Sequence, residues 1–105
     1  MGSERRRAPR YQLVADAEIM NPPSQLCMKA RTSDVSLVGC FINTVYSLPE
    51  GAEIQLKLKY GGTTLSTRGA VARTEPSMGF GVSFAQMKDA EQKLWEKWLE
   101  RVPSK

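Results

Sequence analysis

The chain has 105 residues, 41% of them hydrophobic and 25% charged, which predicts one folded domain with a single hydrophobic core. Its formal net charge is +4 and it contains no histidine, so imidazole metal sites and His-based acid–base or nucleophilic catalysis are excluded. No apolar run reaches transmembrane length and no signal-peptide pattern opens the chain, so we expect a cytoplasmic protein without membrane insertion.

The first ten residues are predicted to form a flexible basic arm. They carry four arginines against one glutamate, so +3 of the net +4 lies there. The four are Arg5, Arg6, Arg7 and Arg10. A guanidinium group matches a phosphate or the O6/N7 edge of guanine with two parallel hydrogen bonds. Because this charge is local, it favours a compact anionic partner over long nucleic acid. An ordinary solvated basic terminus is the alternative.

Two extended runs follow the arm. Residues 11–20 alternate apolar and polar side chains and predict a first strand. Its core positions would be Leu13, Ala15, Ala17 and Ile19. The prolines of Asn21-Pro22-Pro23-Ser24 end this strand, because proline has no place inside a central strand. A second strand is predicted from about Leu26 to Ser33. The segment 34–39 is predicted to be a turn-forming insertion, since Asp and Ser side chains bond nearby backbone N–H groups.

Four more strands are predicted between residues 40 and 84. The β-branched run Cys40–Val45 predicts the third strand. Strict alternation in Ile54–Tyr60 predicts the fourth, and two glycines suited to a hairpin turn connect it to a fifth over residues 63–73. The sixth, Met78–Phe84, has one face holding only two glycines and a serine. Such a bare face admits either another backbone or a flat ligand.

The end of the chain changes from strand to helix periodicity. Asp89 is predicted to cap a helix over about residues 89–102, with Gln92 completing a capping box. An apolar stripe at helical spacing comprises Ala90, Leu94, Trp95, Trp98, Leu99 and Val102. We expect the two tryptophans to pack on the sheet, with a partner-binding surface as the alternative.

These elements predict a mainly β fold. Six strands followed by one helix indicate a small antiparallel barrel or curled sheet with a C-terminal helix, formed by residues 11–105. Cys27 and Cys40 lack the spacing of a zinc site, and we interpret both as small buried hydrophobic residues. The sequence supplies no nucleophile–base pair, metal cage or Walker-type loop. The chain is therefore predicted not to be an enzyme and to need no metal or cofactor.

Three short motifs stand in a specific order along the chain. Residues 6–10 have the pattern R-x-x-x-R, residues 34–39 the pattern D-x-S-x-x-G, and residues 79–84 the pattern G-x-G-V-x-F. Each motif is common alone, but together at this spacing they resemble the PilZ family of bacterial receptor domains for the second messenger cyclic di-GMP. The resemblance covers about residues 4–101.

The resemblance implies a six-stranded β-barrel with a C-terminal helix, and a ligand site where the N-terminal arm crosses the barrel. Carried over by position, Arg6 and Arg10 would contact phosphate and guanine edges. Asp34 and Ser36 would bond guanine, since a carboxylate accepts from guanine N–H groups, and Gly39 would leave room for the ligand. The weaker candidates are Arg7, Arg73, Gly79 and Gly81, with solvent exposure the alternative for Arg7 and a salt bridge for Arg73.

Arg5 bears on stoichiometry. In the family, the residue before R-x-x-x-R influences whether one cyclic di-GMP binds or a stacked pair. An arginine there resembles the pair-binding type, because its planar cation can stack on an exposed guanine. The hypothesis of an intercalated ligand dimer rests on this one residue, and one ligand per protein is the alternative.

The expected function is a bacterial cyclic di-GMP receptor that reorders its arm on binding and signals to an unidentified partner protein. The alternative is a PilZ-like protein–protein adaptor that binds no ligand. A third reading is a small nucleic-acid-binding barrel. It is disfavoured because the chain beyond the arm is nearly balanced in charge and lacks an aromatic ladder on its strands.

Overall fold

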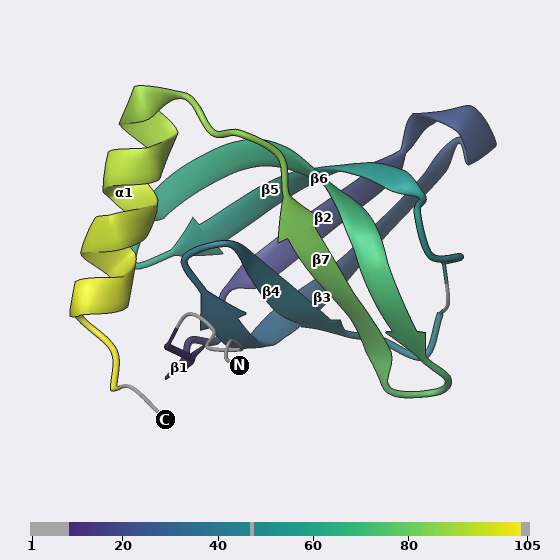
Figure 1. The fold of residues 1–105 in the computed structure, drawn as a ribbon, viewed down its shortest axis with the longest axis horizontal. Coiled ribbons are helices and arrows are strands. Elements are labelled where there is room, and N and C mark those ends of the chain that lie inside the picture. The colour runs from purple at the N-terminus through teal and green to yellow at the C-terminus, as the bar shows by residue number, and fades with distance from the viewer. Residues whose placement is uncertain (1–8, 47, 104–105) are drawn as a thin grey trace, which may run out of the picture.

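Figure 1 shows a computed structural model of the chain, in which residues 9–46 and 48–103 are described. The predictions made for Arg5, Arg6 and Arg7 lie outside these residues. The elements in chain order are β1 (Tyr11–Gln12), β2 (Asp16–Asn21), the 3-10 turn η1 (Pro22–Ser24), β3 (Leu26–Ser36), β4 (Gly39–Asn43), β5 (Glu53–Tyr60), β6 (Thr63–Glu75), β7 (Gly79–Phe84) and α1 (Asp89–Glu100).

Six of the strands close into an antiparallel barrel. Their order is β3-β2-β5-β6-β7-β4, and a further pairing between β4 and β3 closes the ring. The short strand β1 precedes β2 along the same edge of β3 and pairs with the end of β3. The predicted six-stranded barrel with one C-terminal helix is therefore confirmed.

Side-chain alternation decides which face of each strand enters the barrel. In β5, Ile54, Leu56 and Leu58 are buried, whereas the intervening side chains are exposed. The hairpin from β5 to β6 turns at Gly61 and Gly62, whose φ angles of 59° and 83° favour glycine. The predicted hairpin is confirmed.

The helix packs against one end of the barrel (Figure 1). Trp95 and Trp98 are 0% and 1% exposed, so they belong to the core and do not form a partner surface. The Trp95 ring meets Phe84 edge-on at 5.2 Å, and the Trp98 ring lies 5.5 Å from that of Tyr60. These aromatic contacts fix the helix on the sheet.

Two predicted strand boundaries were wrong. The second strand continues through Ser36, because Val35 is buried and pairs with Cys40 after a bulge in the register between β3 and β4. Only residues 37 and 38 form the turn. The first strand is split in two, and the buried Thr32 hydroxyl holds the intervening segment. It accepts from the Ala15 N–H at 2.9 Å and donates to the Leu13 carbonyl at 2.6 Å.

Smaller predictions also need correction. Met78 is 63% exposed and lies in the turn before β7, so the predicted sixth strand begins at Gly79 and not at Met78. Asp89 is the first residue of α1, which follows Lys88 without a side-chain cap and ends at Glu100. Cys27 is exposed, because its neighbour Met28 takes the inward position of β3; Cys40 is buried as predicted. Burial raises the pKa of the Cys40 thiol from 9.0 to about 12.

Candidate functional site

A groove of about 300 Å³ lies between the β3–β4 hairpin and strands β6 and β7. It brings together six residues predicted from the sequence: Arg10, Asp34, Ser36, Gly39, Arg73 and Gly81. Val35, Val38, Cys40, Phe41, Ala72, Val82 and Ser83 complete its lining. Gly79 is not part of it. The groove is therefore where the end of the arm meets the D-x-S-x-x-G segment.

Strand pairing explains why these distant segments meet. Strand β1 runs antiparallel to the end of β3, with Tyr11 opposite Val35 and Gln12 opposite Asp34. Continued by one position, this register puts Arg10 beside Ser36. Asp34 and Ser36 are two residues apart on one strand, so they share the outer face, while Val35 between them faces the core. The carboxylate, the hydroxyl and the Arg10 guanidinium are thus on one side of the barrel wall.

Ser36 is held by two hydrogen bonds. Its hydroxyl accepts from the Val38 N–H at 3.2 Å, which shapes the turn of the β3–β4 hairpin. Its carbonyl accepts from the Trp95 indole N–H at 2.9 Å, which ties the hairpin to α1. The serine of the motif therefore has a role in the fold as well as a position in the groove.

The glycines differ in what requires them. A Cβ added at Gly39 would overlap the carbonyl oxygen of Val82 and lie 3.2 Å from its carbonyl carbon, so glycine lets the β7 backbone come close. Gly79 has a φ of 143°, and a Cβ there would overlap the Ile42 carbonyl oxygen. At both positions the absent side chain admits another backbone. For Gly79, this is one of the two alternatives predicted for the bare face of the sixth strand.

Gly81 is different, because the nearest atoms to an added Cβ would be Arg73 Cγ at 3.5 Å and Arg73 Nε at 3.7 Å. These are ordinary van der Waals distances to a side chain, so nothing in the packing demands glycine here. The bare backbone at this position forms part of the groove wall. Of the three glycines, it is the one whose missing side chain keeps space open in the groove.

Sequence reasoning missed Phe41. Its half-buried ring lines the groove opposite Gly81, and the Arg73 guanidinium carbon lies 5.9 Å from the ring centroid. Arg73 Nε also lies 3.3 Å from a Glu75 carboxylate oxygen, so the salt bridge weighed for Arg73 is present. The signal for Phe41 was in the alternation of the third strand: with Cys40 and Ile42 facing inward, Phe41 must face outward.

The groove combines four kinds of group that suit a guanine nucleotide. A carboxylate accepts hydrogen bonds from guanine N–H groups, guanidinium groups bind phosphates or guanine edges, a hydroxyl can donate or accept, and an aromatic ring offers a stacking surface. Across residues 9–46 and 48–103, no group of three or more Cys, Asp or Glu side chains could hold a metal ion. No helix in these ranges has the length and apolar character needed to cross a membrane.

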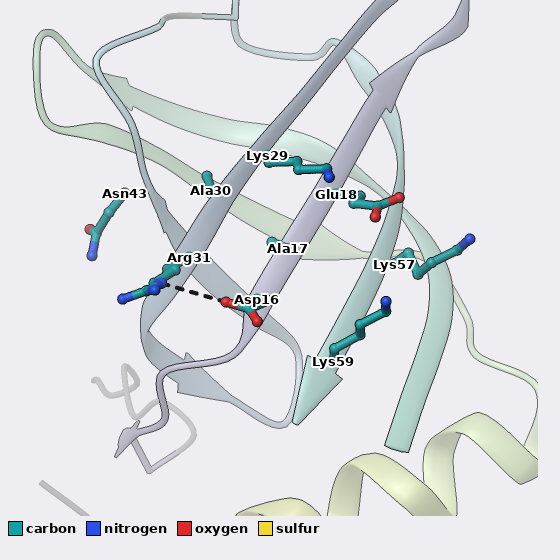
Figure 2. A pocket seen from close by; sticks show the side chains of 9 residues that line it. All are labelled: Asp16, Ala17, Glu18, Lys29, Ala30, Arg31, Asn43, Lys57 and Lys59. Carbon is teal, nitrogen blue, oxygen red and sulfur yellow. Dashed lines mark ion pairs between the residues drawn. The ribbon is translucent and has the colours of Figure 1, made fainter. Parts of the chain in front are cut away.

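A larger hollow of about 570 Å³ lies on the outer face of β3, β2 and β5 and shares no lining residue with the groove (Figure 2). Its charges alternate across the three strands. In one row Glu18 of β2 is flanked by Lys29 and Lys57, and in the next Asp16 is flanked by Arg31 and Lys59.

Arg31 Nε lies 3.5 Å from an Asp16 carboxylate oxygen, and both side chains are more than two-thirds exposed. Acid and base therefore face each other from strand to strand, an arrangement that favours cross-strand charge pairing. The hollow is the larger of the two, but none of the three sequence motifs contributes a residue to its lining.

Both the sequence and the fold of this chain are similar to those of known proteins. The sequence model of the PilZ domain matches residues 4–101. The crystal structure of the PilZ domain of CeSA from a cellulose-synthesizing bacterium is similar, with a TM-score of 0.71 and 13% identity, covering 87% of this chain and 94% of that one. The Bacillus subtilis inhibitor of motility MotI (DgrA) gives a TM-score of 0.74 and 16% identity. That match covers 94% of this chain and 51% of MotI, so the chain spans about half of that protein. No curated protein sequence matches.

Proposed function

The chain belongs to the PilZ domain family, whose members are binding and regulatory domains, and we propose that it is a receptor for cyclic di-GMP. The observation that carries the proposal is the pairing of β1 with the end of β3. This register brings Arg10, the last residue of R-x-x-x-R, beside the first half of D-x-S-x-x-G. Two motifs more than 20 residues apart in the sequence thereby line one groove.

Each side of the groove supports a different part of the recognition. The Asp34 carboxylate accepts from the N1–H and N2–H₂ groups of one guanine, and the Ser36 hydroxyl bonds beside it. Arg10, together with Arg6 of the arm, binds phosphate oxygens and the guanine O6/N7 edge. On the opposite wall, Phe41 and Arg73 stack on the base and neutralise phosphate.

The size of the groove supports a role for the arm. A volume of about 300 Å³ is at the lower end of the range of about 300–1,000 Å³ for ligand pockets. It suits one guanine with its sugar and phosphate better than a whole cyclic dinucleotide. The remainder of the ligand is then covered by the arm, which becomes ordered on binding at an entropic cost. Arg5 stacks on a second, intercalated ligand molecule. The reordered arm changes the surface that a downstream partner protein meets.

Isothermal titration of cyclic di-GMP into the domain tests the proposal. We expect saturable binding that is lost in Arg6→Ala and Asp34→Ala, with two ligands per protein for the wild type and one for Arg5→Ala. Asp16→Ala is the matched control, since this exposed carboxylate lies on the charged outer face away from the groove. A linear GMP dinucleotide controls for general anion binding.

A folded protein that gives no binding heat and no thermal stabilisation with cyclic di-GMP would refute the receptor function. It would favour the alternative, an adaptor that binds a partner protein without the nucleotide. Wild-type binding of one ligand per protein, at concentrations where the free ligand does not self-associate, would refute the intercalated dimer alone.

A further inference from the structure

The turn of the β3–β4 hairpin exposes two apolar side chains beside α1. Leu37 is 41% and Val38 64% exposed. In Figure 1 this turn lies on the side of the barrel that faces the helix. Leu37 separates two hollows, one of about 430 Å³ toward the end of α1 and one of about 450 Å³ toward its start. We call this region, formed by the turn and the adjoining face of α1, the hairpin–helix surface.

The hairpin–helix surface combines apolar and acidic groups. Three carboxylates line the two hollows: Asp89, Glu96 and Glu100. No lysine or arginine is among the described residues that line them, although Lys93 and Lys97 lie on the same helix. The apolar lining includes Leu37, Phe84, Met87, Leu99 and Val102. In a chain with a net charge of +4, this surface has the opposite local charge.

The spacing of the carboxylates matches a helical partner. Asp89, Glu96 and Glu100 lie on one face of α1 and span its twelve residues, a length of roughly 16 Å at 1.5 Å per residue. A partner helix of about three turns has the same length, and its apolar side chains at i, i+3 and i+4 can enter the hollows on the two sides of Leu37. Lysines or arginines on its flanks would then meet the three carboxylates.

The same turn also forms one wall of the proposed ligand groove. Val38 lines both the groove and a hollow of the hairpin–helix surface. Its carbonyl accepts from the Phe84 N–H at 2.8 Å, and the Ser36 carbonyl accepts from the Trp95 indole at 2.9 Å. A ligand that shifts Ser36 would therefore move the turn relative to α1. This coupling, unlike the surface itself, rests on the proposed receptor function.

We propose that the hairpin–helix surface docks a basic amphipathic helix of the partner protein, with Leu37 as the central apolar contact and the carboxylates of α1 pairing with its cations. A second exposed apolar group, Val45, Tyr46 and Met78 at the turns around residues 44–46 and 76–78, has no comparable charge pattern and specifies no partner. The charges of Figure 2 alternate in sign across β3, β2 and β5, and Arg31 and Asp16 form an ion pair there.

A labelled synthetic peptide tests the docking directly. The probe is a helix of about 14 residues with leucines at helical spacing and lysines elsewhere, and its control has glutamates in place of the lysines. Binding is measured by fluorescence anisotropy at about 0.15 M salt, where long-range attraction is largely screened. We expect the lysine peptide to bind and the glutamate peptide not to bind.

Variants then locate the site. Two variants should each weaken binding of the lysine peptide roughly tenfold: the single variant Leu37→Ser, and the double variant that combines Glu96→Gln with Glu100→Gln. The matched controls are Val45→Ser and Glu50→Gln, an exposed apolar residue and an exposed carboxylate that line neither hollow, and they should have no effect. Equal affinity for both peptides, or unchanged affinity in Leu37→Ser, would overturn the proposal.

Two further measurements separate this surface from the receptor function and from another occupant. Specific peptide binding that saturating cyclic di-GMP leaves unchanged, in a protein that binds the nucleotide, would overturn the coupling. Peptide binding without any nucleotide binding would overturn the receptor function alone. Tighter peptide binding after replacing Arg5, Arg6 and Arg7 by alanine would assign the surface to the chain's own arm instead of a partner.

Discussion

Replacing Gly39 by alanine should destabilise the fold, whatever the protein binds. The residue pairs with Ser83 across strands β4 and β7. An added Cβ would come closer to the Val82 carbonyl oxygen than 3.0 Å, a separation below which real Cβ atoms are essentially never found. It would also lie 3.2 Å from the Val82 carbonyl carbon. The obstacle is backbone, so no rotamer change can relieve the overlap, and the two strands must move apart.

The magnitude follows from how firmly β7 is held. This strand is hydrogen-bonded to β6 on one side and β4 on the other, and the Phe84 N–H bonds the Val38 carbonyl at 2.8 Å just beyond Gly39. Overpacking of a well-packed site costs about 1–3 kcal/mol. A loss of about 2 kcal/mol lowers the unfolding midpoint of a domain this size by about 8–16 °C.

Gly81→Ala is the matched control on the same pair of strands. Its Cβ would make contacts no closer than 3.5 Å, with the flexible Arg73 side chain. Alanine in place of a strand glycine contributes about 0.5–1 kcal/mol in favour of folding, so the midpoint should stay unchanged or rise slightly. Its methyl group projects into the groove, so cyclic di-GMP affinity should fall without any loss of stability.

Thermal denaturation followed by circular dichroism measures both variants against the wild type. The expected pattern is a large fall in midpoint for Gly39→Ala and none for Gly81→Ala. A Gly39→Ala midpoint within about 2 °C of the wild type would refute the reasoning, since that shift corresponds to well under 1 kcal/mol. Gly39 would then have no packing role between β4 and β7.

Three other substitutions test separate parts of the fold. Thr32→Val removes both hydrogen bonds of a buried hydroxyl and should lower the free energy of unfolding by about 1–3 kcal/mol in urea denaturation. Trp95→Phe removes the hydrogen bond from the indole N–H to the Ser36 carbonyl. We expect the free energy of unfolding to fall by about 1 kcal/mol and amide hydrogen exchange in the β3–β4 turn to become faster. Unchanged exchange would show that this bond does not hold the turn against α1. For Cys40, whose pKa is raised to about 12, the unfolded thiol ionises first, so stability should fall by up to about 1.4 kcal/mol per pH unit above pH 9. Cys40→Ala should flatten that decline, and a thiol reagent should label only Cys27 in the native protein.

Most of the fold was predictable because it depends on local signals. The alternation of β5, the glycine hairpin and the apolar stripe of α1 each follow from periodicity and turn chemistry within a short window. The failures came where distant contacts decide the outcome. Ser36 is in a strand because Val35 pairs with Cys40, and the first strand divides because Thr32 bonds the segment beside it.

The site was predictable in part for the same reason. The resemblance to the PilZ family predicted Arg10, Asp34 and Ser36 as candidates, and the structure brings all three to one groove. Phe41 was missed because its position opposite Gly81 depends on the register between β4 and β7, which the sequence does not specify. The placement of Arg73 over the Phe41 ring depends on that register too.

The motif residues differ in what they can reveal about function. The Ser36 hydroxyl accepts from the Val38 N–H and shapes the β3–β4 turn, and Gly39 admits the β7 backbone, so a chain could keep both for the sake of the barrel alone. Loss of binding in a Ser36 or Gly39 variant would therefore confound folding with recognition. Arg10 is exposed and Asp34 half-buried on the outer face of β3, and neither side chain enters the hydrophobic core. Because substitutions at these two positions leave the core packing intact, we expect them to test ligand recognition more directly than substitutions at Ser36 or Gly39.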